Sequence, residues 1–159
     1  MAVANYFAGV TTENSDHERY NYEWSRSPRA NPVIVGFFSL TNTLPSAGDQ
    51  TSWCAAFVNF CLYMSSKKAT FSALSGSFRN YSQPTDKPKP GDIVVFSKPG
   101  EEGRQGFGHV GFFDGFEGDK IRVLGGNQRG NTGSTGAVIS WPFPKQSASL
   151  VLHSFRSVS

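Results

Sequence analysis

Charged residues are scarce in this 159-residue sequence. They make up 17% of it, well below the roughly 25% of an average soluble domain. Fifteen Lys and Arg residues against twelve Asp and Glu residues leave a net charge of only +3, and the longest basic run is Lys67-Lys68. Surfaces that bind nucleic acid need clustered basic residues, because phosphate contacts supply most of the affinity. We therefore expect no nucleic-acid partner.

Cysteine and histidine are also few. The two cysteines, Cys54 and Cys61, are seven residues apart, which on a helix separates them by about 10 Å along the axis, so we expect no disulfide between them. The three histidines, His17, His109 and His153, form no Cys/His cluster at zinc spacing. The sequence therefore predicts neither a metal site nor a cofactor.

Long apolar runs are absent as well. None approaches the roughly 18 residues that a membrane span needs, and the first residues lack the charged and apolar regions of a secretory signal. We therefore expect that the protein does not insert into a membrane. We also expect that it is synthesised in the cytoplasm without a signal peptide. The length suits one domain and a monomer, since domains most often have about 100–150 residues.

The N-terminal half carries helical signals. Residues 1–30 are polar, with at most a short helix at 16–24, and are interpreted as an arm packed on a domain formed by residues 31–159. Asn31 is a good N-cap and Pro32 suits the first helical position, which predicts a helix over 32–42. The apolar segment WCAAFVNFCLYM predicts a buried helix over 53–64, capped by Thr51 or Ser52, and a shorter helix is expected over 71–81.

The C-terminal half carries strand signals. Short apolar runs recur between Gly, Pro, Asn and Asp clusters, and they predict strands at 92–96, 109–113, 121–124, 137–140 and 150–155. Helices first and strands second indicate an α+β domain, with the helices on one face of an antiparallel sheet.

Cys54 is the first candidate for chemistry. It lies in the predicted first turn of a helix, where unpaired N–H groups and the helix dipole favour a thiolate. Cys61 lies two turns further, among apolar residues, and is interpreted as a core residue. For Cys54 alone, a small buried hydrophobe is the commoner role.

His109 and Asn127 complete a possible constellation. His109 opens the segment HVGFF with glycines on both sides, an unusual position for a packing residue and a suitable one for a general base. Asn127 ends the next predicted strand, where its amide oxygen could orient the imidazole, as in known Cys-His-Asn sites. A turn residue after two glycines is an equally good interpretation of Asn127. His17 and His153 are weaker candidates.

Four motifs in order, WCAAFVNFCL, PKPGDIVVF, GHVGFF and VLGGNQ, resemble the papain-like cell-wall hydrolases of the NlpC and CHAP type over residues 31–155. The resemblance implies a papain-like fold, with Cys54 as nucleophile, His109 as base and Asn127 as the polar third residue. NlpC enzymes usually carry Asp-Cys-Ser at the nucleophile and a histidine third. Here Trp53 and Ala55 flank Cys54, which brings the site nearer to the CHAP pattern.

Further site candidates follow from the same segments. Gln50, four residues before the nucleophile, is a possible oxyanion donor, although a polar loop residue is an equally good interpretation. Trp53, Gln128 and Gly108 are included as candidates for contacts to the oxyanion or the substrate, with core packing the commoner role for tryptophan.

The implied activity is hydrolysis of an amide bond in peptidoglycan through an acyl-enzyme, by an endopeptidase or an N-acetylmuramoyl-L-alanine amidase. Two alternatives stay open: a non-catalytic module that binds cell wall or peptide, and an acyltransferase or deamidase that uses the same cysteine. An antibacterial effector delivered by a contractile, type VI-like secretion machine and a phage lysin both fit the resemblance. The effector would require a cognate immunity protein.

Overall fold

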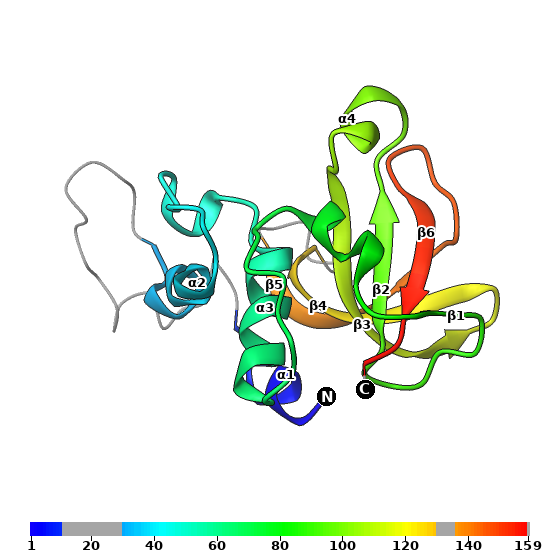
Figure 1. Cartoon of the computed structure of the whole chain (residues 1–159), viewed down its shortest axis with the longest axis horizontal. Coiled ribbons are helices and arrows are strands. Elements are labelled where there is room, and N and C mark those ends of the chain that lie inside the picture. Colours follow the sequence, from blue (N-terminus) through cyan, green and yellow to red (C-terminus); the bar gives the residue numbers. More distant parts are fainter. Residues whose placement is uncertain (11–29, 130–135, 159) are drawn as a thin grey trace.

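A six-stranded antiparallel sheet with helices on one side forms the centre of the molecule (Figure 1). The computed structural model describes residues 1–10, 30–129 and 136–158. The helices are α1 (Ala2–Tyr6), α2 (Pro32–Phe37), α3 (Cys54–Met64) and α4 (Gly100–Arg104), with 3-10 turns η2 (Phe38–Leu40), η3 (Gly48–Gln50) and η4 (Ser75–Asn80). The predicted α+β class is confirmed.

The sheet has the strand order β1-β6-β2-β3-β4-β5. Its strands are β1 (Pro84–Thr85), β2 (Ile93–Ser97), β3 (Gly108–Glu117), β4 (Lys120–Gln128), β5 (Ala137–Phe143) and β6 (Val151–Arg156). All five predicted strands are present, and β3 pairs with β4 as expected for the strands of His109 and Asn127. The two-residue strand β1 and the helices α1 and α4 were not predicted, because each is too short to show a period.

Helix α3 lies between the sheet and the N-terminal helices, so it is buried on nearly all sides (Figure 1). Its side chains join α2 and one face of the sheet in a core cluster that includes Phe37, Phe57, Val95, Val110 and Phe112. A helix enclosed in this way needs apolar residues around its whole circumference. This explains the continuous apolar segment at 53–64.

A second cluster fills the other face of the sheet. It contains Val94, Phe96 and Val123, with Phe143 packed against them. Val95 belongs to the first cluster and its two neighbours to the second, as the alternation of side chains along a strand requires. The sheet therefore separates two apolar layers, of which only the first contacts α3.

The start of α2 follows the sequence prediction. The Asn31 side-chain oxygen accepts a hydrogen bond from the Val33 N–H at 2.9 Å, and Pro32 occupies the first turn. The α-helix ends at Phe37 and continues as the 3-10 turn η2. The predicted span to residue 42 is therefore too long by two residues, and its last turn is tighter than expected.

The predicted cap of α3 is wrong. The helix begins at Cys54, Trp53 takes the N-cap position, and no side chain caps the helix. The Thr51 hydroxyl instead accepts a hydrogen bond from the N–H of Ala47 at 3.3 Å. The first N–H groups of α3 are thus left for other partners.

Asn59 explains why the predicted helix at 71–81 starts late. Its side-chain oxygen accepts hydrogen bonds from the N–H groups of Thr70 and Phe71 at 2.7 and 3.0 Å, and its amide donates to the carbonyls of Ala55 and Ser72. Phe71 is held at a φ of 57°, which a helix cannot include. Only residues 75–80 form a helical turn, η4.

Candidate active site

Cys54 is the first residue of α3 and lies beside the first residues of β3. The paired register of β3 and β4 begins at Phe112 and Leu124, so Val110 lies just outside it. The backbone N–H of Val110 donates a hydrogen bond to the Cys54 sulfur. The thiol therefore touches the strand that carries His109, one residue along.

Three backbone N–H groups converge on the Cys54 sulfur. Besides Val110, they belong to Ala55 and to Cys54 itself, the unpaired donors of the first helical turn. Donors of this kind stabilise negative charge on sulfur and also on an oxygen bound next to it. The helix start therefore provides the polar environment that a nucleophilic cysteine needs.

Burial nevertheless dominates the titration of this thiol. Cys54 is only 6% exposed, and burial raises its pKa above the ordinary value of 9.0, with the three N–H groups lowering it only in part. The expectation that the helix start favours the thiolate is therefore wrong for this structure. Desolvation of the sulfur outweighs the N–H groups and the helix dipole.

Cys61 behaves as predicted for a core residue. It is buried in the first cluster, and burial raises its pKa to about 12. Both cysteines are free thiols in this structure.

His109 is buried, and its ring stacks on Phe143 with ring centroids 5.3 Å apart and an interplanar angle of 22°. Along β3, Val110 and Phe112 belong to the cluster of α3, whereas Phe113 belongs to the second cluster. His109 has the parity of Phe113. In this structure the imidazole is thus directed to Phe143 and makes no hydrogen bond with the Cys54 thiol.

The imidazole of His109 is also electrically neutral here. Burial lowers its pKa to about 4, because the charged form loses its hydration. Its Nε2 atom is buried without a hydrogen-bond partner among the described residues. An unsatisfied buried polar atom costs about 1–3 kcal/mol, so a hydrogen-bond partner for Nε2 would recover at most that amount.

Asn127 lies on β4, next to β3, and its backbone is left-handed with a φ of 56°. Asparagine tolerates this conformation better than other residues with a side chain. A β-carbon at Gly136 would lie 2.1 Å from the Asn127 Oδ1 atom, so this oxygen faces the backbone that leads into β5. The structure brings Asn127 to the strand beside His109 but does not join the two side chains.

Gly126 marks the contact between β4 and the start of α3. A β-carbon there would lie 2.3 Å from the Trp53 ring and 2.9 Å from the Phe57 β-carbon. Only glycine fits this position, so the pair Gly125-Gly126 serves the close approach of the helix to the strand. Trp53 is fully buried by this contact.

Three sequence candidates for substrate contacts have structural roles instead. Trp53 has no exposed surface and cannot line a groove. Gln128 is buried, and its amide donates to the carbonyls of Val123 and Ile139, both at 3.1 Å, across the irregular pairing of β4 and β5. A β-carbon at Gly108 would lie 2.0 Å from the Phe96 carbonyl oxygen, so glycine there permits the pairing of β2 and β3.

Gln50 ends η3, four residues before Cys54, and is exposed. Its side-chain amide donates to Asp49 at 3.3 Å. Asp49 is itself buried and accepts the backbone N–H of Asn31 at 2.9 Å, which fixes the loop to the start of α2. The sequence did not predict the contacts of Asp49 or of the Val110 N–H. A carboxylate in a loop and a backbone donor produce no recognisable pattern of residue types in a sequence.

Neither a metal cluster nor a spanning helix is found in the described part of the chain. Residues 1–10, 30–129 and 136–158 bring no three His, Cys, Asp or Glu side chains together in a metal-binding arrangement. No helix in these ranges is both long and apolar enough to cross a bilayer.

Comparison with protein-family models gives one match, to the CHAP domain, over residues 46–127. The match covers about half of the chain and includes Cys54 and His109, ending on Asn127. The chain belongs to the CHAP domain family. No curated protein and no solved structure matches it significantly.

Membership of the CHAP family gives the class of activity. The CHAP domain is of the amidase and peptidase type that hydrolyses peptidoglycan, and the helix-then-sheet order agrees with its papain-like fold. The matched range begins in the loop before η3 and covers α3 and β1 to β4 except for the last residue of β4. The CHAP match thus contains α3 and β3, the two elements whose N–H groups face the Cys54 sulfur.

Proposed function

We propose that this CHAP domain cleaves an amide bond in peptidoglycan, with Cys54 as nucleophile, His109 as general base and Asn127 as the residue that orients the imidazole. The observation that carries the proposal is the hydrogen bond from the Val110 N–H to the Cys54 sulfur. It fixes the thiol one residue from His109, at the start of a helix with free N–H groups.

The proposed reaction begins with transfer of the Cys54 proton to the His109 imidazole. The thiolate attacks the amide carbon, and the oxyanion is stabilised by the Cys54 N–H and the Gln50 side chain. The imidazolium then protonates the leaving amine, which leaves a thioester. Water activated by the neutral imidazole hydrolyses the thioester and restores the thiol.

This reaction requires the imidazole to leave Phe143 and to bring Nε2 to the sulfur. One feature supports such a movement: Nε2 is buried without a partner among the described residues. His109 is the second residue of β3 and pairs with Phe96 of β2, so the movement involves the first residues of this strand. Because both groups are neutral in this structure, the proton transfer follows the movement.

The test is release of soluble fragments from peptidoglycan sacculi by the purified protein. Cys54→Ala is expected to abolish release, and His109→Ala to reduce it at least about a hundredfold. Cys61→Ala is the matched control, because it removes a buried thiol of the same helix. Undiminished release by Cys54→Ala would exclude the nucleophile.

The role of Asn127 is tested with Asn127→Gly, which relieves the left-handed backbone while it removes the amide. An orienting residue predicts a fall in release at unchanged folding stability. Unchanged release with equal or higher stability would assign Asn127 to the turn alone. Mass spectrometry of the fragments distinguishes an amidase from an endopeptidase, because only the amidase frees the lactyl group of the sugar from its peptide.

A non-catalytic wall- or peptide-binding module is the second candidate function. The stack of His109 on Phe143, without a bond to Cys54, favours it. In this case wild type and Cys54→Ala would sediment equally with sacculi, and neither would release fragments. A deamidase would instead release ammonia from protein glutamine. An acyltransferase would remove the acyl group from a lipid donor.

We further propose that the protein acts in the periplasm or cell wall of a target cell as a monomeric antibacterial effector, countered by an immunity protein that covers the Cys54 region. A wall hydrolase of this kind is harmless where peptidoglycan is absent. Expression with a periplasmic signal should lyse the host, and expression without one should not. A neighbouring gene for a tight inhibitor supports the effector, whereas a neighbouring holin-like gene supports a phage lysin.

A further inference from the structure

A cluster of nitrogen donors lies at the irregular pairing of β6 with β2, away from Cys54. The Arg156 Nε donates to the Ser154 hydroxyl at 3.2 Å, and the His153 Nδ1 lies 2.9 Å from the same hydroxyl oxygen. The register of β6 against β2 shifts between Val95 and Phe96, which places His153 at the bulge. His153 is exposed and Arg156 is half-buried.

The directions of these hydrogen bonds follow from the chemistry of the groups. The Nε of arginine can only donate, so the Ser154 oxygen accepts there. The Ser154 proton is donated to the His153 Nδ1 in the tautomer whose ring proton is on Nε2. In that tautomer, and in the protonated ring, Nε2 carries an N–H. The outward groups are therefore this N–H and the two terminal nitrogens of Arg156, all of them donors.

Arg79 adds a third cationic group. One terminal nitrogen of its guanidinium donates to the Gly103 carbonyl at 2.6 Å and to the Ser97 hydroxyl at 2.8 Å, which ties η4 to β2 and α4. Partial burial, and then the charges of Arg79 and Arg156, lower the pKa of His153. The turn η4, which carries Arg79, packs against β6, which carries His153 and Arg156, so the three side chains lie on neighbouring elements.

No carboxylate neutralises this cluster within the described ranges. The side-chain ion pairs there join Lys98 to Glu102, Arg104 to Glu101, and Arg122 to Glu117. The acidic residues of α4 nearest to Gly103 are therefore already paired.

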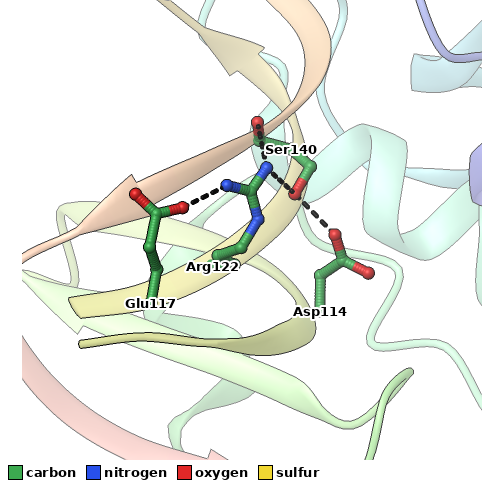
Figure 2. Close-up of polar contacts among 4 residues, drawn as sticks. All are labelled: Asp114, Glu117, Arg122 and Ser140. Carbon is green, nitrogen blue, oxygen red and sulfur yellow. Dashed lines mark hydrogen bonds and ion pairs between the residues drawn. The ribbon is translucent and has the colours of Figure 1, made fainter. Parts of the chain in front are cut away.

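Arg122 provides a clear contrast with Arg156. Figure 2 shows its guanidinium directed at Glu117 and at Ser140, whose hydroxyl donates to Asp114 at 2.6 Å. Arg122 thus donates to one carboxylate and to a serine of this chain, and that serine is itself bonded to a second carboxylate. Arg156 has a serine hydroxyl as its side-chain partner and keeps two nitrogens for a ligand.

We propose that His153, Arg156 and Arg79 form a binding site for a phosphoryl oxyanion. A cluster that presents donors only, with positive charge and without a carboxylate, is complementary to an anion. Donors from two or three side chains suit the several oxygens of a phosphoryl group, whereas one guanidinium already satisfies the two oxygens of a carboxylate. The ligand is free phosphate or a phosphodiester of an anionic polymer.

The site is separate from the proposed reaction. β6 lies on the far side of β2 from β3, and Figure 1 shows it apart from α3. Binding of a phosphoryl group there needs neither Cys54 nor His109. The Cys54→Ala variant should therefore keep it.

The experiment is an NMR titration of the full chain with inorganic phosphate at constant ionic strength, set with chloride. We expect saturable shifts at His153, Ser154 and Arg156 and a rise in the pKa of His153 as the anion binds. Arg156→Gln should weaken binding about tenfold or more. Arg104→Gln is the matched control, since it removes one exposed arginine charge that is already paired with Glu101, and circular dichroism checks that both variants fold.

Arg156→Lys separates geometry from charge, because lysine keeps the charge but lacks the planar fork of donors. Poly(glycerol phosphate) and inorganic phosphate distinguish the two sources: tighter, Arg156-dependent binding of the polymer identifies a phosphodiester, and equal binding per phosphate identifies free phosphate. The proposal is overturned if neither probe gives saturable shifts, if Arg104→Gln weakens binding as much as Arg156→Gln, or if polyglutamate binds as tightly as the phosphate polymer.

Discussion

The sulfur of Cys54 accepts a hydrogen bond from the backbone N–H of Val110, the residue that follows His109. This contact joins the start of α3 to β3 without the use of any side-chain donor. The thiol therefore contacts the residue next to His109 in the chain. The His109 ring itself is stacked on Phe143. The position of the thiol and its activation are therefore two separate properties of this fold.

The first prediction concerns the reactivity of the resting thiol. Because burial raises the pKa of Cys54 above 9.0, we expect its alkylation by iodoacetamide to be slow at neutral pH and to rise with pH without a plateau below about pH 9. Mass spectrometry after timed labelling gives the rate at each cysteine. Cys61, with its pKa raised to about 12, should remain unlabelled, and Cys61→Ser should leave the rate at Cys54 unchanged. A plateau near neutral pH would show a thiolate already paired with His109.

The second prediction concerns stability in acid. The pKa of His109 falls from about 6.5 in the unfolded chain to about 4 in the folded one. Between these values the unfolded state binds the extra proton, so stability is complete above about pH 6.5 and decreases as the pH falls towards 4. The total effect is of the order of 3 kcal/mol.

Urea denaturation at pH 4.5 and pH 7.5 measures this effect. His109→Gln should remove most of the difference that the wild type shows, whereas His153→Gln, at an exposed position, should leave most of it. Equal pH dependence in wild type and His109→Gln would show that other groups cause the loss of stability.

The third prediction concerns the glycine beneath Trp53. Gly126→Ala places a methyl group 2.3 Å from the Trp53 ring, and we expect a loss of about 1–3 kcal/mol of folding free energy. Gly36→Ala is the matched control: Gly36 lies in α2, where an added β-carbon would meet nothing within 4 Å, so it should be neutral or stabilise by up to about 1 kcal/mol. Thermal unfolding gives the melting temperature of each variant. Equal melting temperatures for Gly126→Ala and Gly36→Ala would contradict the close contact.

The fourth prediction concerns Asn59. Its side chain makes hydrogen bonds to Thr70, Phe71, Ser72 and Ala55, so Asn59→Ala leaves several buried backbone groups without partners and should cost about 2–4 kcal/mol.

The matched control for Asn59→Ala is Asn80→Ala, at an exposed position of η4, which should change stability by less than about 0.5 kcal/mol. Hydrogen exchange gives a local readout, since the N–H groups of Thr70 and Phe71 should lose protection. Retained protection in Asn59→Ala would place the support of this loop elsewhere.

Much of the architecture could be predicted from sequence because its signals are local. The Asn31-Pro32 start of α2, the apolar segment of α3 and the short apolar strands are all visible in neighbouring residues. The late start of η4 was not visible, since it depends on hydrogen bonds between Asn59 and residues 11 to 13 positions further along the chain. Contacts of this kind have no period in the sequence.

The candidate site shows the same division. The residue types and order of Cys54, His109 and Asn127 could be predicted, and the family match covers all three. The pKa of Cys54 could not, because it depends on how deeply the sulfur is buried once α3 is covered on both sides. His17 and the short helix expected at 16–24 lie outside the described residues.

The fit of Trp53 over Gly126 has a consequence for related sequences. Any side chain at position 126 would overlap the indole ring of Trp53. Substitutions at positions 53 and 126 therefore depend on each other. We expect relatives that keep a tryptophan before the cysteine to keep glycine at the second position of the GGN segment, and relatives with a smaller residue before the cysteine to admit alanine or serine there. Paired substitutions at these two positions in related sequences would reflect how closely the helix that carries Cys54 approaches the sheet.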